Sequence, residues 1–322
     1  SAGDSIHNTG GSVHILSGHS TKQSSGSITI QTANSGPQGS SGHVNIGSGS
    51  ASSGSSGSLS LTTGNALGGA GGNILISSGD SVDAVGGSIN AVSGSSYTKT
   101  GGAILLSSGA SESGVSGALK ITSAHGKSSG EILIQSGKSA VGSAGSVTVG
   151  AGNAVSGAGD LYLNGGNSDS EVGGSMVIKA GSSGQKTGGG VKFFSGNGLK
   201  ASGEIKFSTA KSGLGSSGSV KLNTGEGATG QTGSITILTG VSQDSNGGSI
   251  SFSSGNVDNG IGGGIVFAAG MSKSSTGGAV LVNSGASKSG HSGEIRVQTK
   301  SSGSTKSSGS IFVETGKAFG GN

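Results

Sequence analysis

The side chains that could carry chemistry are sparse and scattered in this 322-residue chain. It has no cysteine, so disulfides, thiolate metal sites and thiol catalysts are excluded. Only three of the six histidines, His7, His14 and His19, lie close together in sequence. A metal site on these three is the alternative to exposed wall or loop imidazoles, which we favour. We therefore expect no metal and no cofactor.

Catalytic motifs are also absent. The triplets Gly-Lys-Ser at 126–128 and 137–139 would each need a glycine five residues earlier to form a phosphate-binding loop, but Ile121 and Ile132 stand there. No Ser-His-Asp order can be identified, and with so many serines a chance match is uninformative. Carboxylates do not recur in register, which disfavours a calcium-dependent repeat. The sequence predicts a protein that is not an enzyme.

The composition of the chain disfavours two further classes of function. The chain contains 73 glycines and one proline, 10% charged residues and a net charge of +4. Nucleic-acid binders concentrate Lys and Arg with aromatic side chains, whereas this chain has one arginine, Arg296, and two isolated tyrosines. No apolar run is long enough to span a bilayer. We expect neither nucleic-acid binding nor a membrane span.

One repeat fills the chain. Its signature is Gly-x-apolar-x-apolar-x-small-Gly, as in GSVHILSG from Gly11 and GSIFVETG from Gly309, and there are 21 copies. Fifteen of the twenty intervals between opening glycines are 15 residues, and the others are 13, 14, 14, 16 and 16. Such a period indicates one continuous repeat array over residues 1–322.

The positions of the repeat have distinct characters, counted from the opening glycine as position 1. Positions 3 and 5 are apolar in all copies, while position 4 varies freely, which is the alternation of a strand with one buried face. Position 7 is always Ser, Thr, Ala or Gly, and position 8 is Gly in 17 copies. Position 10 is nearly always small. We expect positions 10 and 14 to face inward, and the glycines to form corners with positive φ or close backbone approach.

These features predict an all-β fold, a parallel β-solenoid of about 21 rungs built from the 15-residue repeats. Identical positions would stack along its axis, so Phe193 would lie above Phe207 and Phe252 above Phe267. One alternative is a coil of 30 residues, in which the apolar faces of alternate copies oppose each other. An up-and-down meander ranks third, because loops of seven or eight residues are long for so many hairpins.

Three lysines suggest the one candidate binding site. Lys192, Lys206 and Lys221 occupy position 4 of three successive copies and would stack on the outer wall of a solenoid. Like charges so placed repel, and a bound sulphated or uronic polysaccharide would relieve the repulsion. A solvated lysine face that resists aggregation is the favoured alternative.

The two ends fall within a repeat copy and show no distinct cap. A solenoid without caps exposes strand edges. We therefore expect the chain to be a slice of a longer array or to self-associate end to end.

The repeated phrase small-Gly-Ser-apolar-x-apolar-x-Ser-Gly, without cysteine, resembles the Gly/Ser-rich repeats of very large extracellular proteins of algae and protists, including diatom-type coat, adhesive and flagellar-hair proteins. The resemblance implies a secreted, non-enzymatic protein that forms filaments or matrix. We expect an extracellular structural protein, the shaft of a filament, coat or adhesin. The alternative function is a solenoid that binds ice or polysaccharide through one flat wall.

Overall fold

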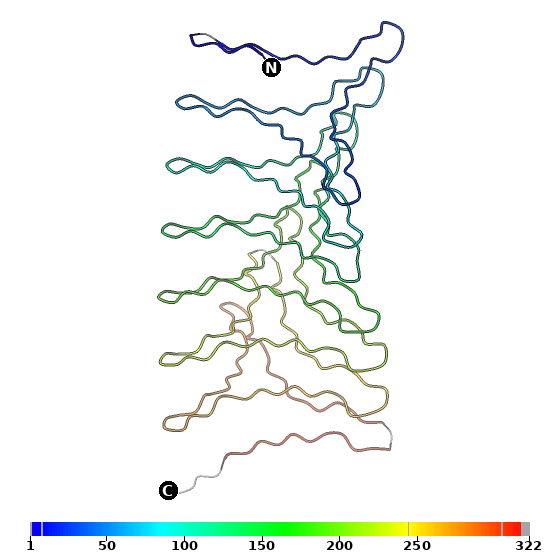
Figure 1. Cartoon of the computed structure of the whole chain (residues 1–322). Coiled ribbons are helices and arrows are strands. Elements are labelled where there is room, and N and C mark those ends of the chain that lie inside the picture. Colours follow the sequence, from blue (N-terminus) through cyan, green and yellow to red (C-terminus); the bar gives the residue numbers. More distant parts are fainter. Residues whose placement is uncertain (1, 8, 244, 304, 317–322) are drawn as a thin grey trace. The chain divides into compact units, whose positions relative to one another are not determined.

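The structure is a computed structural model that describes residues 2–7, 9–243, 245–303 and 305–316. In these ranges the backbone forms no helix and no strand (Figure 1). The predicted parallel β-solenoid is therefore wrong, and so is the 30-residue coil, because both need strands paired in register from one turn to the next. No helix able to cross a bilayer occurs in the described ranges.

The chain divides into two units, Ser1–Leu161 and Tyr162–Asn322. The boundary falls between positions 3 and 4 of the copy that opens at Gly159, so both units are built from the same repeat. In each unit, extended segments alternate with narrow loops (Figure 1). Positions 1–8 form the extended half of each copy, and the remaining residues form the loop half.

The alternation of apolar and polar residues persists in the extended half as a difference in exposure. Residues at position 3 are 47–68% exposed, and Ile74 is 55% exposed where its neighbour Leu75 at position 4 is 86% exposed. No described residue is buried. The faces assigned from the sequence are thus correct in direction, but within the described ranges no opposing wall covers the inward face.

Two aromatic contacts join successive copies. The ring centroids of Phe193 and Phe207 are 6.2 Å apart, and those of Phe252 and Phe267 are also 6.2 Å apart. Both predicted pairs are confirmed as neighbours. Their rings meet edge to face, at 82° and 84°, which is a preferred aromatic geometry.

Eleven of the 21 loop halves that precede an opening glycine are closed by a backbone hydrogen bond between glycines. The N–H of Gly26, at position 1, donates to the C=O of Gly18, at position 8 of the preceding copy, at 2.9 Å. The bond recurs at 2.8–3.1 Å from the N–H of Gly11, Gly87, Gly102, Gly117, Gly159, Gly174, Gly189, Gly203, Gly278 and Gly293. The end of one extended segment therefore lies beside the start of the next, as at the mouth of a hairpin.

Serine at position 10 supports the loop from within. In the 15-residue copies with serine there, its Oγ accepts a hydrogen bond from the N–H three residues later, at 2.8–3.2 Å. The eleven serines are Ser20, Ser81, Ser96, Ser111, Ser139, Ser168, Ser183, Ser212, Ser242, Ser272 and Ser287. Serine favours such turns because its short side chain reaches nearby backbone.

The inward orientation expected at position 14 is wrong. Val85, Val115, Val172 and Ile261 at position 14 are 91–98% exposed. At position 10 the serine hydroxyls bind a backbone N–H within the loop, and Ser139, Ser212 and Ser272 are partly buried there.

Loop length changes the role of the serine. In the two 16-residue copies the hydroxyls of Ser35 and Ser302 donate to the carbonyls of Gly39 and Lys306, four residues later. A backbone bond also closes a four-residue turn in each, with Gly39 N–H bound to Gly36 C=O in one of them. The only proline, Pro37, follows Gly36, where its fixed φ suits the second position of a turn.

The glycines at positions 1 and 8 differ in how much space there is for a side chain. A methyl group on Gly87, at position 1, would stand 3.0 Å from Cβ of Ser78, at position 7 of the preceding copy. Position-1 glycines face a position-7 Cβ in this way in 19 of the 21 copies, at 3.0–3.9 Å. An added Cβ would stand closer than 3.4 Å to a neighbouring atom at ten of the 21 position-1 glycines, which favours Gly at position 1 in those copies.

Position 8 shows no such constraint. None of its 17 glycines has an atom within 4 Å of an added Cβ. Gly260, at position 13, is the one described residue with φ in the left-handed range, at 136°. The expectation of close approach or positive φ is therefore confirmed at position 1 and wrong at position 8, and nothing in the structure explains the glycines there.

Candidate interaction site

The three lysines predicted as a binding site lie on consecutive extended segments. Lys192, Lys206 and Lys221 are all exposed, and no described carboxylate pairs with them. Lys192 and Lys206 directly precede Phe193 and Phe207, whose edge-to-face contact brings their two copies together. The stacking expected along a solenoid wall required paired strands, which the described residues lack.

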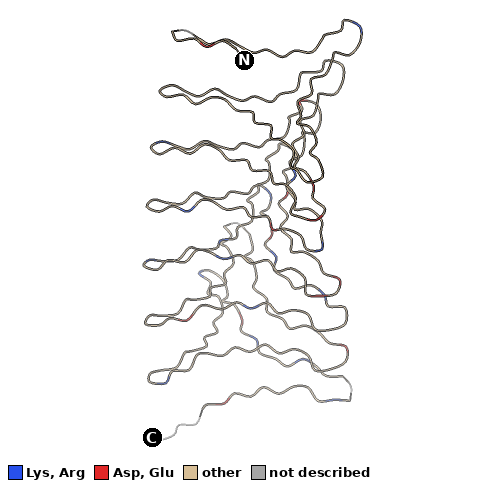
Figure 2. Ribbon diagram, in the orientation of Figure 1, with Lys and Arg blue, Asp and Glu red and all other residues tan. Residues whose placement is uncertain are grey.

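Four further lysines lie outside position 4, one at position 6 of an extended half and three in loop halves, so the pattern at position 4 does not reveal them. They are Lys179, Lys186, Lys200 and Lys211, and all are exposed. Residues 179–221, which we name the basic segment, thus contain seven lysines and one carboxylate, Glu204. Local net charge along the sequence is the signal that would have found them. Figure 2 shows the positions of the charged residues along the ribbon, with Lys and Arg in blue and Asp and Glu in red.

The loops of the basic segment are supported by the serine turns described above. Ser183 Oγ accepts from the N–H of Lys186 at 2.9 Å, and Ser212, which follows Lys211, accepts from the N–H of Gly215 at 3.0 Å. Two of the four additional lysines therefore project from hydrogen-bonded turns. The backbone next to these two lysines is held by the same serine hydrogen bond that recurs in other copies.

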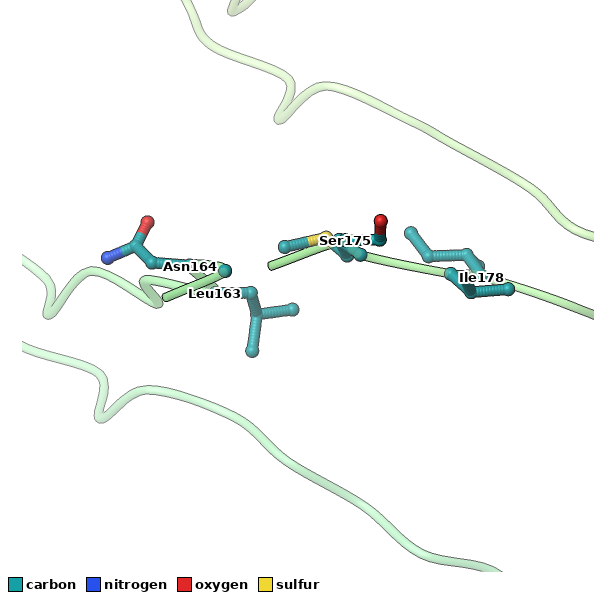
Figure 3. A pocket seen from close by; sticks show the side chains of 7 residues that line it. Leu163, Asn164, Ser175 and Ile178 are labelled. Atoms are coloured by element: carbon teal, nitrogen blue, oxygen red, sulfur yellow. The ribbon is translucent and has the colours of Figure 1, made fainter. Parts of the chain in front are cut away.

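An apolar hollow lies near the start of the second unit. It is lined by positions 5–7 of one copy, Leu163, Asn164 and Gly165, and by positions 2–5 of the next, residues 175–178. Figure 3 shows Leu163 and Asn164 at the end of one segment and Ser175 and Ile178 on the following one. The hollow has no titratable side chain in its lining.

The remaining candidates form no site. His7, His14 and His19 are exposed, and no group of three His, Cys, Asp or Glu able to hold a metal occurs in the described ranges. A second hollow is lined only by the turn Gly36-Pro37-Gln38-Gly39. It has no charged side chain.

Comparison with protein-family models, with curated proteins and with solved structures finds no match. The functional argument therefore depends on the chemistry of the repeat itself.

Proposed function

We propose that this chain is an extracellular structural protein whose repeats build the shaft of a filament, coat or adhesin by association with further copies of the chain. The observation that carries the proposal is the recurrence of one closure, the bond from the position-1 glycine to the position-8 glycine, in both units. A chain in which the same hydrogen-bonded loop recurs presents the same surface in each copy, and such a surface suits a long assembly of repeats.

The apolar face of the extended halves supports association. Position 3 is Ile, Val, Leu or Met in every copy, and each of these side chains remains about half exposed. Contiguous exposed apolar surface is characteristic of protein–protein contact. Further copies of the same repeat present a matching face at the same 15-residue spacing, so association covers these side chains periodically.

The test uses two variants of the full chain, each with three aliphatic side chains replaced by serine. One replaces position-5 residues of three copies, Ile76→Ser, Leu106→Ser and Ile134→Ser. The other replaces apolar loop residues that are essentially fully exposed, Leu67→Ser, Val82→Ser and Val141→Ser. Sedimentation and electron microscopy follow assembly as a function of concentration.

The unaltered chain is expected to form filaments. The position-5 variant should need a concentration at least about tenfold higher, since lost apolar burial of a few kcal/mol weakens each contact. The loop variant should assemble like the unaltered chain. A chain that stays monomeric at high concentration, or two variants that assemble equally well, would contradict the proposal.

The extracellular location has a separate test. Antibodies raised against the chain should label material outside its source cells. Labelling confined to the cell interior would remove the filament, coat and adhesin roles together. The alternative of ice binding through a flat wall stays a prediction.

A further inference from the structure

We propose that the basic segment, residues 179–221, binds a linear polysaccharide that carries sulphate or carboxylate groups. This inference goes beyond the self-association argued above and does not depend on it. It starts from charge, because seven of the chain's lysines fall in these 43 residues against the single carboxylate Glu204. The segment carries a net charge of +6, whereas the whole chain carries +4, so the rest of the chain is slightly acidic.

The lysines are available to a ligand. All seven are exposed, and no described carboxylate lies within ion-pairing distance of any of them. Cations that have no protein partner and repel one another are stabilised when a polyanion displaces its own counterions to bind them. The basic segment is therefore the part of the chain where binding an anionic polymer releases the most free energy.

The spacing of the lysines favours a polymer over a small anion. They occur on extended segments and in or beside loops of successive copies, with no cavity that collects them. A single sulphate ion would contact one or two of the side chains at most. A linear polymer with a charge on each sugar can follow the segment and engage several lysines at once.

The chemistry favours a polysaccharide over a nucleic acid. The segment has lysines and no arginine, so it lacks the planar fork that recognises phosphate through two parallel bonds. Of its three aromatic rings, Phe193 and Phe207 contact each other. Only Phe194, 84% exposed, is left to stack a base, whereas single-strand binders present successive stacking rings.

The experiment compares two full-length variants with the same change in net charge. The first replaces the seven lysines of the basic segment: K179Q, K186Q, K192Q, K200Q, K206Q, K211Q and K221Q. The second replaces seven exposed lysines elsewhere: K22Q, K99Q, K120Q, K127Q, K138Q, K273Q and K288Q. Binding of dextran sulphate, polygalacturonate and single-stranded oligo-dT is titrated at about 50 and 200 mM NaCl.

The unaltered chain should bind at least one of the two polysaccharides and lose about 100-fold or more in affinity between the two salt concentrations. The first variant should lose at least about 30-fold at low salt, and the second less than about threefold. The two polysaccharides distinguish sulphate from carboxylate recognition. Equal losses in both variants, or no binding to either polysaccharide, would overturn the proposal. Oligo-dT binding as tight as the better polysaccharide would overturn it in favour of a nucleic acid.

Assembly provides a check on folding that is independent of binding. Both seven-lysine variants should form the same assemblies as the unaltered chain, because no replaced side chain lies on the apolar face. Loss of polysaccharide binding with assembly intact would then locate the defect in the basic segment itself.

Discussion

The two halves of each repeat differ in the regularity of their sequence and in the hydrogen bonds that they contain. The extended half has the regular pattern, with apolar side chains at positions 3 and 5, yet these side chains remain about half exposed or more. The loop half has irregular sequence and varying length, yet it contains the glycine closure and the serine turn. Local order in a single chain therefore comes from hydrogen bonds of the loop, while the apolar pattern of the extended half becomes useful only when another surface covers it.

The largest effect is expected at the glycine that closes the loop. Gly87→Ala would place a methyl group 3.0 Å from Cβ of Ser78 and 3.4 Å from the carbonyl oxygen of Gly79, so Ser78 and the backbone that carries it must shift by a few tenths of an ångström. We expect a cost of about 1–3 kcal/mol, measured as faster hydrogen exchange of the amide at position 87.

Two alanine substitutions serve as matched controls for Gly87→Ala. Gly79, at position 8, and Gly130, at position 1 of the copy after the 13-residue interval, both have open space around an added Cβ. Alanine at either site should change stability by less than about 0.5 kcal/mol. A cost at Gly130 equal to that at Gly87 would show that close approach is not the reason for glycine at position 1.

The next effect concerns the serine turn. Ser111→Ala removes the oxygen that accepts from the N–H of Gly114 at 2.9 Å. The expected loss is about 1 kcal/mol, because this hydrogen bond is exposed and water partly replaces it. Exchange of the Gly114 amide measures the change. Ser113→Ala, in the same loop, removes a hydroxyl that makes no hydrogen bond and should leave that amide unaffected.

A smaller effect tests the aromatic contact between copies. A double-mutant cycle on Phe193→Ala and Phe207→Ala should give a coupling of about 0.5 kcal/mol, since the rings meet edge to face but remain partly exposed. The corresponding cycle on Phe194 and Phe207, whose rings make no such contact, should give none. Equal coupling in both cycles would mean that Phe193 and Phe207 do not interact specifically.

The smallest effect in a single chain is expected in the extended half. Asn90→Asp at position 4 should change stability by less than about 0.5 kcal/mol. Ile89→Asp should also cost little in the isolated chain, because Ile89 is already 58% exposed, but it should prevent assembly, where the charge would be buried without a partner. Strong destabilisation of the single chain by Ile89→Asp would mean that position 3 is covered within the chain.

Much of this organisation follows from the sequence. The 15-residue period, the sheltered face and the contacts Phe193–Phe207 and Phe252–Phe267 were all predictable from alternation and spacing. The backbone partners were not, because alternation shows which side chains share a face but not which carbonyl a given N–H will bind. Ser111 shows the same limit, since a small residue suits an inward-facing position and a turn equally well.

The candidate binding site was predictable only in part. The sequence interpretation selected Lys192, Lys206 and Lys221 because they share one repeat position. The described residues contain no solenoid wall on which these lysines would stack. The loop lysines such as Lys186 became relevant once the serine turns showed that the loops are ordered. Whether the basic segment binds a polyanion stays a prediction.

Amide hydrogen exchange on the unaltered chain tests the central claim most directly. It should be measured residue by residue, at a concentration where sedimentation shows a single chain. Loop closure predicts that the amides of Gly26, Gly102 and Gly278, which donate to position-8 carbonyls, exchange more slowly than the amides at positions 3–5 of the same copies. Fast exchange at these glycines with slow exchange at positions 3–5 would contradict the claim, because it would place the backbone hydrogen bonds in the extended half.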